Sequence, residues 1–222
     1  MFKAIAYKEW LKIRWFVIGT GILSLLWMGN IFLNVNHSMK FTEAINYWYN
    51  VIFRGLEFYS SYLFIPMIIG LVLAAAQFVP ETTDKRIKLT FHLPLGENNV
   101  LLQMLAVGLI SLVSIFVISF ILLAVLTGIY FPGEVVISMM LTTLPWFLAG
   151  LVIYLAAAAV ILEPNWWQRF FITAVSIGFL NLLTTNHWYN IYQRSILFFF
   201  MIGLCFCLSL LLSGHRFRKG VA

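Results

Sequence analysis

Long apolar runs separated by short polar segments make up most of this 222-residue chain. Six of the runs approach or exceed the roughly 20 residues that a helix needs to cross a hydrocarbon layer about 30 Å thick. No internal repeat and no Pro/Gly/Ser-rich linker divides them. The pattern therefore predicts a single all-α domain, residues 1–222, with six transmembrane helices. We expect these helices at about residues 15–35, 62–79, 101–131, 135–162, 170–185 and 196–213.

Composition supports a membrane location for most of the chain. Hydrophobic residues make up 62% of the sequence and charged residues only 10%, and the mean hydropathy is +0.95. Soluble domains carry about 25% charged residues, so this chain cannot cover a globule with polar surface. The net charge of +6 does not indicate nucleic-acid binding, because the cations lie beside the apolar runs rather than on a soluble face.

The distribution of lysine and arginine predicts the orientation. With the N-terminus inside, eleven cations fall in inner segments and three in outer segments, which places both termini in the cytoplasm. Cytoplasmic termini and reduced thiols at Cys205 and Cys207 fit a bacterial inner membrane. The inner cations are Lys3, Lys8, Lys12, Arg14, Lys85, Arg86, Lys88, Arg169, Arg216, Arg218 and Lys219, and the outer ones are Lys40, Arg54 and Arg194.

Residues 1–14 are too polar to cross the membrane, but they form an amphipathic pattern. The apolar side carries Phe2, Ala6, Trp10 and Ile13. This pattern predicts an interfacial helix on the inner leaflet, and the alternative is a frayed basic leader that only sets the orientation. The residues expected at the inner leaflet are Lys8, Trp10, Lys12 and Arg14.

The long outer segment, residues 37–59, carries a second amphipathic pattern. Its apolar residues recur at spacings of three and four, which is typical of a surface helix, and Gly55 and the Ser60–Ser61 pair are the expected break before the next span. The apolar positions are Phe41, Ile45, Trp48, Ile52 and Leu56.

Catalytic chemistry is not indicated. None of the six predicted spans has Asp, Glu, Lys or Arg at its centre, and the four histidines are scattered over both sides. Metalloprotease, nucleophile-elbow and P-loop motifs are missing from the sequence, so we expect no enzyme activity, no metal and no cofactor in this chain. Pro66 and Pro145 would lie inside spans, as hinges or as static kinks.

Uncharged polar residues within the predicted spans have two possible roles. They can join helices by hydrogen bonds, which we favour, or they can contact a substrate. These residues are Asn30, Asn34, Gln77 and Asn181.

The segment 80–97, PETTDKRIKLTFHLPLGE, is the most densely charged part of the chain. Two acid-to-base pairs, Glu81 with Lys85 and Asp84 with Lys88, are four residues apart in the favourable direction, and Pro80 suits a first helical turn. These features predict a short cytoplasmic helix between the second and third spans. Its apolar residues would need a partner to cover them.

Two stretches, FKAIAYKEWLKIRW at the N-terminus and PETTDKRIKLTFHLPLGE, resemble the permease subunits of type 2 ABC transporters. The resemblance implies an N-terminal elbow helix, six spans, and a coupling helix that docks on a cytoplasmic P-loop ATPase dimer, which would bind the ATP and magnesium. It also implies a second permease copy or paralogue, surrounding membrane lipids, and export or translocation of an amphipathic, lipid-like or peptide substrate. The coupling residues it implies are Glu81, Lys85, Arg86, Leu89, His92 and Leu93.

Two other functional classes remain open from the sequence. A membrane scaffold or sensor subunit could use the same loop to bind a soluble partner without transporting anything. An intramembrane enzyme of lipid metabolism would need clustered catalytic polar groups at one leaflet, and the sequence pattern does not reveal such a cluster.

Overall fold

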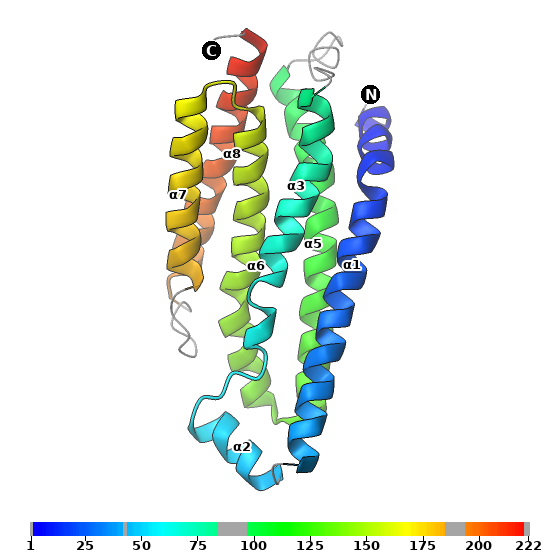
Figure 1. Ribbon diagram of the computed structural model, residues 1–222, viewed down its shortest axis with the longest axis vertical. Helices are drawn as coiled ribbons and strands as arrows, with labels where there is room; N and C mark the ends of the chain where they lie inside the picture. Colours follow the sequence, from blue (N-terminus) through cyan, green and yellow to red (C-terminus); the bar gives the residue numbers. More distant parts are fainter. Residues whose placement is uncertain (1, 42–43, 84–96, 185–193, 220–222) are drawn as a thin grey trace.

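The computed structural model describes residues 2–41, 44–83, 97–184 and 194–219, and the regular structure within these ranges is helical. Six long helices lie roughly side by side, and the marked chain termini lie at the same end of the bundle (Figure 1). The helices are α1 (Phe2–Phe41), α2 (Ala44–Phe53), the short 3₁₀ turn η1 (Ser60–Tyr62), α3 (Ile65–Thr83), α5 (Glu97–Tyr130), α6 (Gly133–Leu162), α7 (Trp166–Thr184) and α8 (Ile196–Lys219).

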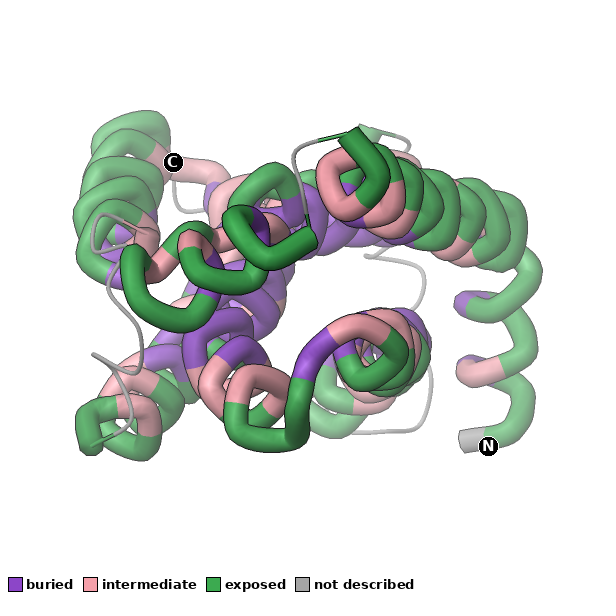
Figure 2. Tube along the Cα trace, turned by 90° about the horizontal axis from the view of Figure 1, so that it is seen from below, coloured by how far each residue is buried: buried purple, intermediate pink, exposed green. Residues whose placement is uncertain are grey.

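The prediction of a multi-pass membrane protein is confirmed at the level of helix length and composition. Five helical stretches are long and apolar enough to cross a membrane, in α1, η1–α3, α5, α6 and α8. Many large apolar residues of these helices are exposed, as expected of surfaces that contact lipid. Figure 2 shows that the exposed residues lie mainly on the outward sides of the helices. The fifth predicted span, 170–185, corresponds to α7, which is helical but is not among these five.

The elbow does not form a separate helix. Residues 2–41 are one continuous helix, although Figure 2 shows that its first turns run in a different direction from the rest. Of the predicted apolar side, Ile13 is buried and Trp10 is 45% exposed, while Ile5 and Glu9 are buried as well. A glutamate can occupy the buried side because its charge is paired there, as described below.

Pro66 lies inside the second span, as predicted. It is the second residue of α3, where its missing N–H has no helical partner to lose, so it does not kink this helix. Pro80 lies inside α3, which continues to Thr83, and therefore does not begin a new helix. Pro145 does lie inside its helix, α6, as predicted.

Helices α3 and α6 form the centre of the bundle, and small residues let them approach closely. A Cβ atom added at Gly70 would collide with the backbone carbonyl of Gly150, and one at Gly150 would meet the carbonyl oxygen of Pro66 at 2.6 Å. This contact brings the first turns of α3 against the middle of α6. The remaining long helices pack around this pair (Figure 1).

The end of the bundle opposite the termini is closed by α2 and a cluster of aromatic rings. Phe131 lies between Phe58 and Trp48, with ring centroids 5.2 and 5.8 Å away. The chain leaves α2 through Gly55, whose φ of 68° is in the left-handed region that glycine adopts readily. Gly55 therefore breaks the helix as predicted.

The apolar stripe predicted for this outer helix is exposed, and a different side of the helix faces the protein. Its buried residues are Tyr47 and Val51, while Ile45 of the predicted apolar stripe is 83% exposed. The aromatic cluster, not the longest apolar stripe, decides which side of α2 faces the protein.

We expect Gly70→Ala to lower the stability of the bundle by about 1–3 kcal/mol, because the backbone of α6 leaves no room for a methyl group. Thermal unfolding of the purified protein in detergent measures the effect. Gly19→Ala is the matched control, since nothing lies within 4 Å of a Cβ at that position. Equal stability of the two variants would contradict the close α3–α6 contact.

Candidate functional site

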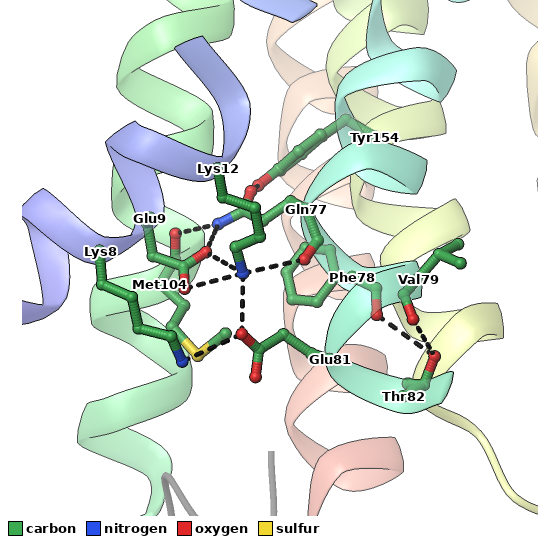
Figure 3. Close-up of polar contacts among 10 residues, drawn as sticks. All are labelled: Lys8, Glu9, Lys12, Gln77, Phe78, Val79, Glu81, Thr82, Met104 and Tyr154. Atoms are coloured by element: carbon green, nitrogen blue, oxygen red, sulfur yellow. Dashed lines mark hydrogen bonds and ion pairs between the residues drawn. The ribbon is translucent and has the colours of Figure 1, made fainter. Parts of the chain in front are cut away.

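A buried polar network joins four helices at the end of the bundle that carries the termini (Figure 3). Gln77 of α3 lies at its centre and is fully buried. The Gln77 Nε2 donates to Glu9 Oε2 of α1 at 3.0 Å and to the backbone carbonyl of Met104 of α5 at 2.7 Å, and its Oε1 accepts from the hydroxyl of Tyr154 of α6 at 2.6 Å. One amide side chain therefore bonds to three other helices.

Lys12 supplies the charge that makes the network possible. Its Nζ donates to Glu9 Oε1 at 2.9 Å, to Glu81 Oε1 at 2.9 Å and to the backbone carbonyl of Gln77 at 3.1 Å. An ammonium has three donors, and these contacts use all of them. The Lys8 Nζ lies 3.0 Å from the same Glu81 oxygen.

The four charges of the network balance. Glu9 and Glu81 are 0% and 1% exposed, and each is paired with lysine. Burying an unpaired carboxylate would cost several kcal/mol, so the lysines are a condition for the two glutamates to lie here. The side chain of Lys12 is only 16% exposed, while that of Lys8 is 46% exposed and extends from the solvent side.

Helical spacing brings these groups onto facing surfaces. Lys8 and Lys12 are four residues apart on α1, and Gln77 and Glu81 are four residues apart on α3, so each pair projects from one side of its helix. The network lies in the last turns of α3, which contain the first residues of the charged segment 80–97. The start of that segment is therefore fastened to the N-terminal turns of α1.

A second buried carboxylate, Glu163, lies in the turn between α6 and α7. Its Oε2 accepts from the Ser213 hydroxyl at 2.7 Å and from Arg216 at 3.1 Å, both on α8. Arg169 of α7 donates through Nε to the Glu163 backbone carbonyl. Glu163 is 0% exposed and ties the end of α6 to the beginning of α7 and the end of α8.

The structure describes only part of the predicted coupling set. Glu81 is buried beneath α1, so in this conformation it holds the start of the segment and does not face outward. The other five residues lie outside the described ranges: Lys85, Arg86, Leu89, His92 and Leu93.

The residues predicted at the inner leaflet divide into two groups. Lys8 and Lys12 bind Glu81, whereas Arg14 is exposed and its guanidinium lies 5.4 Å from the ring centroid of Trp15. Trp10 is partly exposed beside them, as a residue at the membrane surface would be.

Of the four polar span residues, Gln77 does join helices as expected. Asn34 donates to Asn30 at 2.7 Å within α1, and both are exposed, so neither joins helices through this hydrogen bond. Asn181 is exposed on α7.

Sequence reasoning missed several members of these clusters, namely Glu9, Tyr154 and Glu163. Glu9 interrupts an apolar face, and its spacing of three from Lys12 was the available signal. Tyr154 is the only tyrosine of its span, and its hydroxyl, which usually finds a hydrogen-bond partner when buried, was the available signal. Glu163 follows the end of a span, where exposure to water is the ordinary expectation.

No protein-family model, curated protein or solved structure matches the chain. The network joins the N-terminal turns of α1, the end of α3, and helices α5 and α6 through short hydrogen bonds. Its lysines and its glutamine are engaged with internal partners, and only the buried Oε2 of Glu81 lacks one among the described residues. Such an arrangement suits transmission of movement better than turnover of a substrate.

We expect Lys12→Met to destabilise the protein by about 3–5 kcal/mol, because two buried carboxylates lose the cation they share. Arg14→Met, which removes an exposed cation two residues away, should change stability little. Adding Glu9→Gln and Glu81→Gln to Lys12→Met should recover much of the loss. Thermal unfolding in detergent compares the variants, and no difference between Lys12→Met and Arg14→Met would exclude the shared ion pair.

Proposed function

We propose that the chain is the permease subunit of an ATP-driven type 2 ABC transporter, moved by a separate ATPase docked on the segment 80–97. The observation that carries the proposal is the attachment of this segment to α1 through Glu81, Lys8 and Lys12. A segment that only connected two spans would not need a buried, charge-balanced anchor at its beginning. A segment that receives force needs one.

The hydrogen bonds of Gln77 to three other helices support this proposal. A push on the end of α3 would reach α1 through Glu9, α5 through the Met104 carbonyl and α6 through Tyr154. Because each bond is short and buried, the four helix ends would move together. The chain would then respond as a lever, which is what a subunit without its own energy source requires.

The proposed topology has six crossings, with α7 as the fifth. The α6 helix ends where α7 begins, and α8 begins near the far end of α7 (Figure 1). If α6 and α8 both cross, α7 must cross between them. At 19 residues it is about 28 Å long, close to the hydrocarbon thickness.

Under this proposal the end that carries the termini is cytoplasmic. Lys3, Lys8, Arg14 and Arg169 lie on segments at that end, while Lys40 is at the opposite end. The N-terminal turns of α1 would act as the elbow at the inner leaflet. A second copy or a paralogue would complete a pathway for an amphipathic substrate in a bacterial inner membrane, with ATP and magnesium bound by the ATPase dimer.

Co-expression with an ATPase encoded in the same genome tests the proposal. We expect Leu89→Asp together with Leu93→Asp to abolish co-purification and stimulation of ATP hydrolysis, because the substitutions place charges on the apolar contact surface. Ile45→Asp, at an 83% exposed position on α2, is the matched control and should leave both unchanged. Retained binding without any stimulation in the unsubstituted chain would favour a scaffold, and retained binding in the Leu89/Leu93 variant would remove the segment from docking.

The orientation is tested by labelling single cysteines in a Cys205→Ser, Cys207→Ser background. With a membrane-impermeant maleimide, Arg54→Cys should react in intact cells and Lys85→Cys only after lysis. Arg54 is exposed and lies just after α2, so accessibility does not limit its reaction. Labelling of Lys85→Cys in intact cells would reverse the topology and end the proposal.

A further inference from the structure

An apolar groove of about 250 Å³ runs between α7 and α8. It lies within their apolar stretches, between the first half of α7, which contains Phe171 and Val175, and the middle turns of α8, which contain Ile202 to Ser209. Its lining residues are Phe171, Ile172, Val175, Ile202, Cys205, Phe206 and Ser209.

Two sets of contacts join α7 and α8, one at each end of this groove. Deeper in the bundle, the ring of Phe179 contacts Phe199 and Phe206, with centroids 5.9 and 6.0 Å apart. At the terminal end, Glu163 binds Ser213 and Arg216 of α8. The groove therefore lies between these two contacts. It opens on the side of the bundle, where a membrane protein faces lipid.

The terminal end of the groove carries excess positive charge. Arg169 and Arg216 both bond to Glu163, which leaves one positive charge uncompensated within this cluster. Arg216 has five N–H donors, directs one nitrogen at the carboxylate, and has a side chain that is 36% exposed. The network around Gln77 has no such excess, since its two lysines balance two glutamates.

Along α8, Ser213 lies about one turn beyond Ser209, and Arg216 lies about two turns beyond it. The guanidinium of Arg216 therefore belongs to a turn just past the groove. On α7, Gln168 precedes Phe171 and Ile172 by about one turn, and its buried Oε1 has no hydrogen-bond partner. An apolar channel thus leads to a cationic and polar end at the level where a lipid headgroup lies.

We propose that this groove binds one anionic phospholipid from the leaflet on the side of the termini. An acyl chain lies in the groove, and the phosphate is held by Arg216 and Arg169. Basic pockets between transmembrane helices recognise anionic headgroups in this way, and arginine suits phosphate because of its planar set of donors. The site depends on membrane insertion alone and stands whether or not an ATPase docks on the segment 80–97.

Native mass spectrometry of the full chain, titrated with phosphatidylglycerol or with phosphatidylcholine of the same acyl chains, tests the site. The unsubstituted protein should bind phosphatidylglycerol more tightly. In a Glu163→Gln background, the double variant Arg169→Gln, Arg216→Gln removes both headgroup cations and their excess charge without leaving a buried carboxylate unpaired, and should reduce that preference about tenfold. Arg14→Gln, which removes an exposed cation from α1 at the same end, should not reduce it.

The acyl-chain part of the site has its own test. Ser209→Trp fills the groove and should abolish tight retention of phosphatidylglycerol, whereas Leu208→Trp, at a neighbouring position that is 62% exposed, should not. Thermal unfolding shows whether each variant is folded. Undiminished lipid retention in Ser209→Trp, or an undiminished phosphatidylglycerol preference in the double variant, overturns the proposal.

Discussion

The arrangement of this bundle depends on a single electrostatic constraint: a charge withdrawn from water must be paired. Glu9 and Glu81 are buried between α1 and α3, and Lys12 compensates both. Once the lysine is placed, the N-terminal turns of α1 can no longer separate from the end of α3 without exposing or orphaning a carboxylate. Gln77 extends the constraint to α5 and α6, because its amide has partners on both.

Packing divides the bundle into a tightly joined centre and a looser side. The backbones of α3 and α6 meet at Gly70 and Gly150, where no side chain separates them. Helices α7 and α8 are instead joined at the Phe179 rings and at Glu163, with a groove between those contacts. Under the two proposals, the first side would transmit movement and the second would hold a lipid.

The proposed transport role and the proposed lipid site both follow from where charge is balanced and where it is not. The α1–α3 network has equal numbers of acids and bases, so under the proposal it would serve as a mechanical junction. The Glu163 cluster has two arginines for one carboxylate and an exposed guanidinium, so it can attract an anion. The difference in charge balance is thus the basis for proposing different functions for two clusters at the same end of the bundle.

The sequence by itself determined the class of the protein, since long apolar runs with few charges have only helices as a stable form in lipid. It also located most of the helices and the turn at Gly55, because hydropathy and glycine's backbone freedom are local properties. Only the tertiary structure decided that Glu9 is buried, that Tyr47 rather than Ile45 faces the protein, and that Pro80 lies within α3. Each of those outcomes is set by a partner distant in the chain, and periodicity along one helix carries no information about which partner will compensate a charge or cover a ring.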